Sequence, residues 1–287
     1  MLIVGVFCGL ASQMNQYAFA LMLRKRFPSA DVRLLDGCDW MRDSGHNGYE
    51  LNRVFGIKPD KVDLNLVKKL ANFYPEYGLK AKAFNAMYQL RDKIIGPRKT
   101  QIMMNETARD SAVLANLDLS RDWLFWGNAQ AWVYGEVEEE MRRAFAFRIP
   151  LEGENARLAD EMAKVNSVSI HLRRGDYIKF GFQLLGEDYY QRAVTKISEV
   201  VADPHYYVFS DDLDEAHRMF SSLRNVTFVT GNRGPSSYID MQLMSLCKNN
   251  IIANSGFSFM GAWLNDNPDK VIVGHASNLP VPGYLQV

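Results

Sequence analysis

Residues 167–176 read SVSIHLRRGD, a run of buried-strand character that ends in two arginines, a glycine and an aspartate. The apolar residues at its start predict a strand over residues 167–171. Strands and helices alternate in the sequence that follows. Strands are predicted at 206–210, 226–230, 250–254 and 271–273, and helices at 188–201, 213–220, 238–248 and 257–264. This alternation is typical of a doubly wound α/β domain, in which ligands bind at the carboxyl ends of parallel strands.

The first half of the chain begins with a second α/β pattern. Residues 1–8 form an apolar run that predicts a buried strand, the Gly9-Leu10-Ala11-Ser12 turn follows, and residues 13–27 and 31–36 fit a helix and a strand. This order is a βαβ unit and predicts a parallel sheet. Further along, the pattern is helical at 62–93 and 136–147 and strand-like at 100–104 and 123–126, with a polar loop at 37–49. Because Ile149-Pro150 ends the last helix, we predict two domains, residues 1–152 and residues 153–287.

Composition excludes several function classes. Lys and Arg number 33, as do Asp and Glu, so there is no basic field for nucleic acid and any anion must be bound locally. The three cysteines, Cys8, Cys38 and Cys247, have no C-x-x-C spacing, which favours reduced structural thiols and a cytoplasmic location. No apolar stretch reaches the length of a membrane span.

Three polar clusters follow predicted strands in the second half. The first is His171-Leu172-Arg173-Arg174-Gly175-Asp176, the second Ser210-Asp211-Asp212, and the third Asn254-Ser255-Gly256-Phe257-Ser258. Since parallel strands end at one edge of their sheet, we expect all three clusters to lie together.

The residue types in these clusters suit a phosphorylated ligand. Guanidinium groups such as those of Arg173 and Arg174 bind phosphate oxygens bidentately, although an Arg–Asp176 ion pair beside a core histidine would also explain the motif. Asn254 or Ser255 could cap a helix whose free N–H groups meet a phosphate, or could be a plain cap. The carboxylates of Asp211 and Asp212 could accept from a nucleoside, or cap a helix.

A metal site has weaker support. Asp212-Leu213-Asp214 has the D-x-D spacing of metal-dependent glycosyltransferases, but Asp214 falls in a predicted helix, where a first-turn acid complements the helix dipole. The phosphate-loop, dinucleotide-binding, zinc-protease and nucleophile-elbow motifs are all absent from the sequence.

Taken together, the clusters resemble the conserved blocks of the α-1,2-fucosyltransferases of glycosyltransferase family 11, of bacterial type. His171–Asp176 matches that family's H-x-R-R-x-D motif, which α-1,6- and protein O-fucosyltransferases share. Other stretches that fit the family are residues 209–212, 238–247, 251–258 and 261–265, the N-terminal run 9–20 with Gln13, and His46-Asn47-Gly48-Tyr49-Glu50-Leu51.

The resemblance implies a GT-B-like fold, two Rossmann-type α/β domains facing across a cleft, with GDP-fucose bound mainly by the second. It implies inversion at the anomeric carbon without a metal or another cofactor, and no nucleic-acid partner. By resemblance, Arg173 stabilises the leaving diphosphate and Arg174 supports the loop and the nucleotide. The other residues expected to bind substrate are His171, Ser210, Asp211, Asp212, Asn254, Ser255, Phe257, Ser258 and Gln13.

An inverting displacement also needs a base that deprotonates the acceptor hydroxyl as it attacks. His46, Asp36 and Asp176 are candidates by residue type, and His46 lies in a predicted loop of the first domain. His171 fits better as a residue oriented within its motif than as a base.

The sequence departs from the family pattern at a few positions. Ala11-Ser12 stands where Gly-Asn is usual, Asn15 replaces an aromatic, and Phe259-Met260 replace two tryptophans. The changes near residue 12 bear on acceptor choice, and those at 259–260 are either repacking or an altered stacking surface.

The leading hypothesis is transfer of fucose from GDP-fucose to the 2-hydroxyl of a terminal galactose on an oligosaccharide or a lipid-linked glycan. Such an acceptor places the protein in the cytoplasm or, as a peripheral protein, at the cytoplasmic face of the membrane. The alternatives are another fucosyl linkage or GDP-sugar, a non-catalytic GDP-sugar or glycan-binding relative, and a metal-dependent transferase that uses Asp212 and Asp214.

Overall fold

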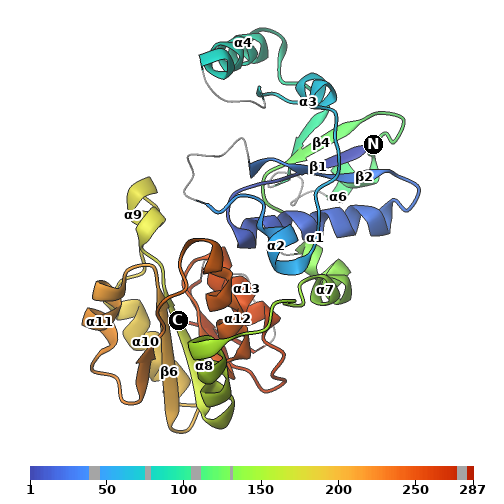
Figure 1. The fold of residues 1–287 in the computed structure, drawn as a ribbon. Helices are drawn as coiled ribbons and strands as arrows, with labels where there is room; N and C mark the ends of the chain where they lie inside the picture. Colours follow the sequence, from blue (N-terminus) through green and yellow to red (C-terminus); the bar gives the residue numbers. More distant parts are fainter. Residues whose placement is uncertain (39–45, 75–78, 105–110, 130–131, 277–282) are drawn as a thin grey trace. The chain divides into compact units, whose positions relative to one another are not determined.

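The computed structural model describes residues 1–38, 46–74, 79–104, 111–129, 132–276 and 283–287 (Figure 1). The chain divides into two compact units, Met1–Arg148 (unit 1) and Ile149–Val287 (unit 2). The division follows Arg148, whereas the sequence places it after residue 152. None of the helices that the structure describes combines the length and apolar character needed to cross a lipid bilayer.

Unit 1 is built on a four-stranded sheet with the strand order β2-β1-β4-β3. All its strand pairs are parallel, as the βαβ pattern predicts. The strands are β1 (Leu2–Val6), β2 (Val32–Asp36), β3 (Gln101–Met103) and β4 (Trp123–Trp126). The helices are α1 (Leu10–Arg26), α2 (Glu50–Phe55), α3 (Leu64–Leu70), α4 (Leu79–Ile95), α6 (Ser111–Ala115) and α7 (Trp132–Ala144).

Helix α1 fixes the loops at the carboxyl end of β1. Its last turn carries three basic residues, which complement the helix dipole. Two of them also bind α7: Arg26 pairs with Glu136, and Lys25 pairs with Glu140 at 3.2 Å. Near its start, Gln16 accepts the backbone N–H of Phe7 through Oε1 at 2.8 Å. The strand-to-helix turn is therefore held by a buried amide side chain.

Unit 2 contains a six-stranded sheet with the order β10-β9-β8-β5-β6-β7, and every pair in it is parallel. The strands are β5 (Asn166–Leu172), β6 (Pro204–Ser210), β7 (Val226–Phe228), β8 (Asn249–Ile251), β9 (Ile272–Gly274) and β10 (Tyr284–Gln286). The helices are α8 (Gly153–Lys164), α9 (Gly175–Phe180), α10 (Glu187–Ser198), α11 (Leu213–Phe220), α12 (Tyr238–Leu246) and α13 (Gly256–Leu264), with a 3-10 turn at Gly234–Ser236. The doubly wound α/β pattern predicted for this half is confirmed.

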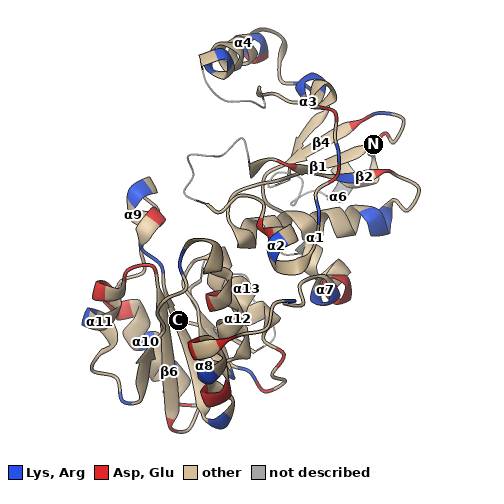
Figure 2. Cartoon of the chain, in the orientation of Figure 1, with Lys and Arg blue, Asp and Glu red and all other residues tan. Residues whose placement is uncertain are grey.

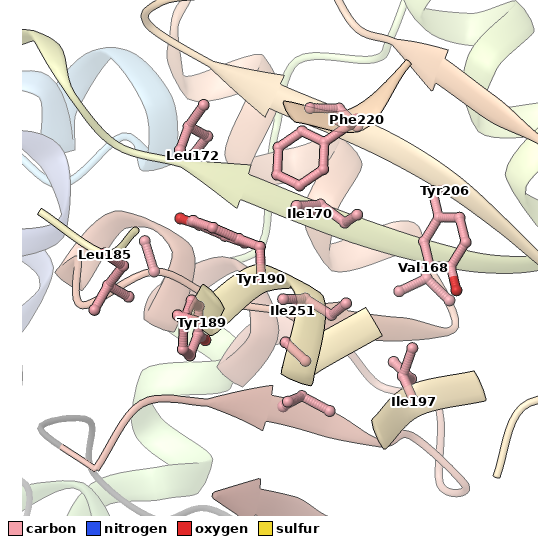
Figure 3. Packing of buried hydrophobic residues seen from close by; sticks show 14 of the residues in the cluster. Val168, Ile170, Leu172, Leu185, Tyr189, Tyr190, Ile197, Tyr206, Phe220 and Ile251 are labelled. Atoms are coloured by element: carbon pink, nitrogen blue, oxygen red, sulfur yellow. The ribbon is translucent and has the colours of Figure 1, made fainter. Parts of the chain in front are cut away.

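Alternate residues of β5 and β6 pack into two separate hydrophobic cores, one on each face of the sheet. Val168, Ile170 and Leu172 pack with Tyr190 of α10 and other buried residues on one face of the sheet (Figure 3). On the opposite face, Tyr207 and Phe209 of β6 pack with residues of α8 and α12, Leu158, Met162, Leu243 and Met244 among them. Because helices cover both faces, the charged residues of this region follow the ends of β5 and β6, as Arg173, Arg174 and Asp211 do.

Several elements differ from the sequence prediction. The helical pattern over residues 62–93 is two helices, because the chain turns to extended backbone at Ala71 after α3. Helix α8 occupies the expected domain boundary, and the six-residue helix α9 follows directly after the paired arginines. Residues 39–45 of the predicted loop lie outside the described residues.

Packing at β1 gives a stability prediction. A Cβ added at Gly5 would lie 2.2 Å from Cε3 of Trp126, whose ring stacks on Phe7 with centroids 4.2 Å apart. Gly5→Ala should therefore destabilise unit 1 by roughly 1–3 kcal/mol, the usual cost of overpacking, and lower the melting temperature by several degrees.

Gly135→Ala is the matched control, because Gly135 is exposed in α7 and an added Cβ meets nothing within 4 Å. Alanine there should be neutral or stabilise by up to about 1 kcal/mol. Thermal denaturation followed by circular dichroism compares the two, and equal melting temperatures would contradict the packing argument.

Candidate active site

The three polar clusters follow three neighbouring strands of unit 2. Strand β5 lies between β8 and β6, and Leu172 at its end is in register with Ser210 at the end of β6. Ile170 of β5 is in register with Ile251 of β8. The structure therefore brings the clusters to the same edge of one sheet.

Arg173 is held by two carboxylates from different loops. Its Nη2 lies 2.7 Å from Oδ2 of Asp176, and its Nη1 lies 2.9 Å from Oδ2 of Asp211. The guanidinium also lies over the ring of Tyr177, 5.8 Å from the centroid. About a quarter of the arginine side chain is exposed (25%), and its buried Nε has no hydrogen-bond partner among the described residues. The guanidinium is thus fixed in orientation with donors left over.

Arg174 faces the acids of the second cluster. Its backbone N–H donates to Oδ1 of Asp211 at 2.9 Å. Its side chain pairs with Asp212 (Nε to Oδ2, 3.2 Å) and with Glu215 in the first turn of α11 (Nη1 to Oε1, 3.4 Å). Arg174 therefore ties the loop after β5 to the start of α11, which agrees with the supporting role that the family resemblance implies.

Gly175, which directly follows the two arginines, has no room for a side chain. A Cβ at Gly175 would lie 2.9 Å from Oδ2 of Asp211, the atom that pairs with Arg173. A side chain there would push the carboxylate away from both arginines, and so Gly175 permits the close approach of the two loops.

His171 is a buried neutral imidazole. Burial, and then the nearby charge of Arg173, lower the pKa of His171 to about 3. Its Nδ1 has no hydrogen-bond partner among the described residues, and its ring lies 5.8 Å from that of Phe257. A group of such low proton affinity is a poor base at neutral pH, so His171 acts within its motif by position.

The second and third clusters include helix caps. Asp212 accepts the backbone N–H of Glu215 at 3.1 Å and caps α11, while the hydroxyl of Ser210 bonds to both backbone groups of Asp212 at 3.0 Å. Ser255 Oγ accepts the backbone N–H of Phe257 at 3.3 Å and caps α13. Asp212 and Ser255 are therefore helix caps, as one of the two sequence interpretations predicts. The first N–H groups of α13 lie at the same edge of the sheet as the arginines.

The remaining residues of the third cluster have unequal exposure. The hydroxyl of Ser258 is buried and donates to the carbonyl of Ser255 at 3.2 Å, so it stabilises the turn. Asn254 donates its side-chain amide to the carbonyl of Gln183 at 2.9 Å, and its own carbonyl accepts the hydroxyl of Tyr177 at 2.8 Å. Tyr177 of α9 thus links the arginine loop to the third cluster.

Sequence reasoning missed two residues at this edge. One is Tyr177, which directly follows the motif. The other is Arg233, whose Nη1 donates to the carbonyl of Ser210 at 2.9 Å. Its signal was a Gly-Asn-Arg-Gly-Pro turn after the predicted strand at 226–230, which the pattern treats as an ordinary loop.

The two aspartates of the D-x-D spacing have structural roles. Asp212 caps α11 and pairs with Arg174, and Asp214 is an acid of the first turn of α11. Among the residues that the structure describes, no group of three or more His, Cys, Asp or Glu side chains is placed to hold a metal ion.

The substrate-binding and base candidates of the predicted first domain lie in unit 1. Gln13 is fully buried: its Nε2 donates to the carbonyls of Cys8 (2.7 Å) and Gly48 (2.8 Å), and its Oε1 accepts the backbone N–H of Glu50 (2.8 Å). These bonds, with a longer one from the Leu51 N–H at 3.4 Å, occupy the amide. Both polar atoms of the Gln13 side chain are therefore hydrogen-bonded within unit 1, and neither is left for the expected contact with substrate.

The base candidates His46 and Asp36 lie near the carboxyl ends of β1 and β2. His46 is exposed, and a Cβ at Gly9, in the turn after β1, would lie 3.1 Å from its Nδ1. Asp36 is the last residue of β2 and accepts the backbone N–H of Cys38 at 2.9 Å.

Two of the departures from the family pattern, at Asn15 and at Phe259-Met260, have structural explanations. Asn15 donates to the carbonyl of Ala129 at 2.9 Å and to the hydroxyl of Tyr134 at 2.8 Å, so it ties α1 to a distant loop of unit 1. Phe259 and Met260 are buried in α13, which favours the repacking interpretation.

Comparison with known proteins gives a family match in unit 2. Residues 153–278, nearly all of unit 2 with the three clusters, match the model of glycosyl transferase family 11. This match and the two relatives described next support the assignment to this family. The comparisons support a glycosyltransferase.

Two relatives of this chain are from Escherichia coli. The O-antigen biosynthesis glycosyltransferase WbnK is 46% identical over 114 residues, 38% of this chain and only 37% of WbnK. An alpha-1,2-colitosyltransferase is 29% identical over 277 residues, which cover 90% of this chain and 85% of the relative.

Solved structures support the fold of this chain. The fucosyltransferase NodZ from Bradyrhizobium superposes with a TM-score of 0.54 at 15% identity, covering 91% of both chains. The α-1,6-fucosyltransferase NodZ soaked with GDP-fucose gives 0.55, at 15% identity over 92% of this chain and 91% of that one. NodZ has a GT-B-like fold, so the expected α/β class with parallel sheets is confirmed.

The buried histidine predicts a pH dependence of stability. Since the pKa of His171 falls to about 3 in the folded protein from 6.5, the unfolded state binds the extra proton between these values. Stability should therefore fall as the pH drops from 6.5 toward 3, by about 1.4 kcal/mol per pH unit from this group.

Urea unfolding of the wild type and of His171→Leu at pH 7.5 and pH 5 tests this. The wild type should lose roughly 2 kcal/mol more than the variant on acidification. Burial raises the pKa of Asp240 to about 7, which acts in the opposite direction but is common to both proteins. Parallel pH profiles of the two proteins would show that the imidazole is not the cause.

Proposed function

We propose that this family 11 enzyme transfers L-fucose from GDP-fucose to the 2-hydroxyl of a terminal galactose, with inversion and without a metal ion or other cofactor. The observation that carries the proposal is the fixed pair Arg173 and Arg174 at the carboxyl edge of the unit 2 sheet. The NodZ structure soaked with GDP-fucose supports the donor, because its fold is shared by this chain.

Arg173 supplies the main electrostatic contribution in this mechanism. As the glycosidic bond to the diphosphate breaks, negative charge builds on the leaving oxygen, and cationic donors aimed at that position lower the barrier. A guanidinium has five N–H donors, and the pairs with Asp176 and Asp211 need only one from each Nη. The remaining donors of Arg173 serve the diphosphate.

The acids around the arginines act as positioning residues. Asp176 and Asp211 hold the Arg173 guanidinium from two sides, so little reorganisation is needed when the diphosphate binds. Arg174, anchored by Asp212 and Glu215, keeps the loop after β5 in place.

The nucleotide is assigned to the same edge. The N–H groups at the start of α13, beside Ser255, suit a phosphate, and Phe257 and Asn254 border that position. Ser210 and Ser258 shape the two turns through their backbone hydrogen bonds.

For the acceptor, we assign the base to unit 1 and choose His46. It is exposed and lies beside the turn at Gly9, which follows the first strand of the sheet, whereas Asp176 is engaged by Arg173. The acceptor that fits the relatives is a galactose-terminated repeat of a surface polysaccharide, since WbnK is named for O-antigen biosynthesis.

A second candidate differs only in the donor sugar. The alpha-1,2-colitosyltransferase matches 90% of this chain, more than WbnK does. Colitose in place of fucose would use the same arginines and the same linkage, so the two candidates differ in the contacts made to the sugar.

Turnover assays separate these functions. Purified enzyme with GDP-fucose and a set of galactosides should release GDP and form an α-1,2-fucosyl product, identified by linkage analysis, with full activity in EDTA. Turnover with an activated colitose donor and none with GDP-fucose would replace the leading function by the second candidate. Loss of activity in EDTA would contradict the metal-free mechanism.

Calorimetry with GDP completes the comparison. Binding of GDP without transfer or hydrolysis for any donor would show that the chain is a non-catalytic GDP-sugar-binding relative.

Arg173→Ala should lower kcat on the order of a thousandfold, because a charged donor to the developing diphosphate is lost. Arg157→Ala is the matched control: Arg157 is also ion-paired, with Glu154, but lies on α8 with half of its side chain exposed (53%). The control should keep full activity. A near-normal rate in Arg173→Ala, with an unchanged melting curve, would place the site elsewhere.

A further inference from the structure

Helix α4 of unit 1 presents an apolar stripe to solvent. Leu79, Ala83, Met87, Leu90 and Ile94 are spaced by three or four residues and so share one face of the helix. The four large side chains among them are 86%, 62%, 60% and 72% exposed in chain order. A soluble protein rarely leaves so regular an apolar face without a partner.

The opposite face of α4 holds the helix on unit 1. The ring of Phe84 stacks on Tyr74 at 4.7 Å, and the backbone N–H of Tyr74 donates to Asn85 at 2.6 Å. The hydroxyl of Tyr88 donates to the carbonyl of Lys68 in α3 at 3.2 Å. Because these residues already attach the helix, the apolar stripe is not needed for its docking.

Cations border the stripe on both sides. At 100° per residue, exposed Lys80 lies along one edge of the stripe and exposed Lys82 and Lys93 along the other. Asp92 is the acidic residue of α4, and it pairs with Arg91 at 2.7 Å on the side away from the stripe. Figure 2 shows this basic character on α4 and also on α3.

A helix face that is apolar in the middle and has lysines along both borders is best suited to bind one kind of surface. A helix of this type lies in the plane of a bilayer, with its apolar side chains among the acyl chains and its lysines at anionic headgroups. A second copy of the chain fits less well, because a two-fold contact would bring the lysine borders of the two helices together.

We propose that α4 binds unit 1 to the surface of a membrane that contains anionic lipids. The chemistry recognised is a phosphate-bearing headgroup layer over hydrocarbon, and the binding depends on Leu90 and its neighbours together with Lys80, Lys82 and Lys93. The sugar that the enzyme transfers plays no part, so this proposal and the proposed function are tested separately.

Sedimentation with lipid vesicles tests the proposal on the full chain. Vesicles of phosphatidylcholine with phosphatidylglycerol should bind the protein, and vesicles of phosphatidylcholine alone should bind it at least tenfold more weakly. Raising the salt from 0.05 M to 0.5 M should weaken binding to the anionic vesicles, because the lysine–headgroup attraction is screened.

Two variants separate the apolar and the charged contributions. Leu90→Glu should weaken vesicle binding at least tenfold, and Lys82→Gln should weaken it roughly fivefold. The matched controls are Val200→Glu, at a residue of similar exposure (56%) in unit 2, and Lys164→Gln in α8. Both controls should bind as the wild type does, and all variants should melt within a few degrees of it.

Other outcomes would overturn the proposal. Absence of binding to anionic vesicles, or equal effects of the α4 variants and their controls, removes the membrane role of α4. If light scattering shows a dimer that Leu90→Glu dissociates, with no vesicle binding, the stripe is a contact between copies. Protection of α4 from hydrogen exchange in a monomer that does not bind vesicles would show that the chain itself covers the stripe.

Discussion

The carboxylate of Asp211 is the group on which the candidate site depends. One oxygen pairs with the guanidinium of Arg173 and the other accepts the backbone N–H of Arg174, both at 2.9 Å. A single side chain at the end of β6 therefore fixes both arginines at the end of β5. This works because Leu172 and Ser210 are in register in a parallel pair, so that the two loops leave the sheet side by side. The absent side chain of Gly175 provides the space for that approach.

The charge balance of the cluster has a consequence for selectivity. Two guanidinium groups face four carboxylates, those of Asp176, Asp211, Asp212 and Glu215. At a distance the four acids outweigh the two positive charges, so the edge does not attract anions in general. At hydrogen-bonding range the remaining guanidinium donors are directional and already oriented. A ligand therefore gains from the arginines only by fitting the edge, which suits an enzyme that must select one diphosphate-linked sugar.

Much of this arrangement was predictable from the sequence, for a physical reason. Strand periodicity in a buried parallel sheet is strong, and the rule that strand ends share an edge then placed Arg173, Asp211 and Asn254 together. The Arg–Asp176 ion pair was anticipated from the motif, and the structure has it between Arg173 and Asp176. The partners from the next loop were harder to predict, because the choice of Asp211 over Asp212 for Arg173 depends on loop geometry that has no sequence period. Helix α9 was missed since six residues give too short a pattern, and with it the contact of Tyr177. In unit 1, the family resemblance implied a substrate-binding role for Gln13. A polar residue on a helix is equally suited to bind backbone, and the Gln13 amide does so in the structure.

The amide side chains of α1 show how a shared fold can accommodate different acceptors. Gln13, Asn15 and Gln16 bind the backbone near residues 8, 48 and 129 and the N–H of Phe7, and so they fix the paths of loops that are distant in sequence. Loops fixed by buried amides do not depend on their own exposed side chains for their shape. Exposed loop residues of unit 1 that take no part in the chemistry can then change without loss of the fold. Under the proposed function the donor side has no such freedom, because a diphosphate needs guanidinium groups at set positions. We therefore expect specificity for the acceptor to reside in the exposed loop side chains of unit 1, while the arginine edge of unit 2 keeps the chemistry constant.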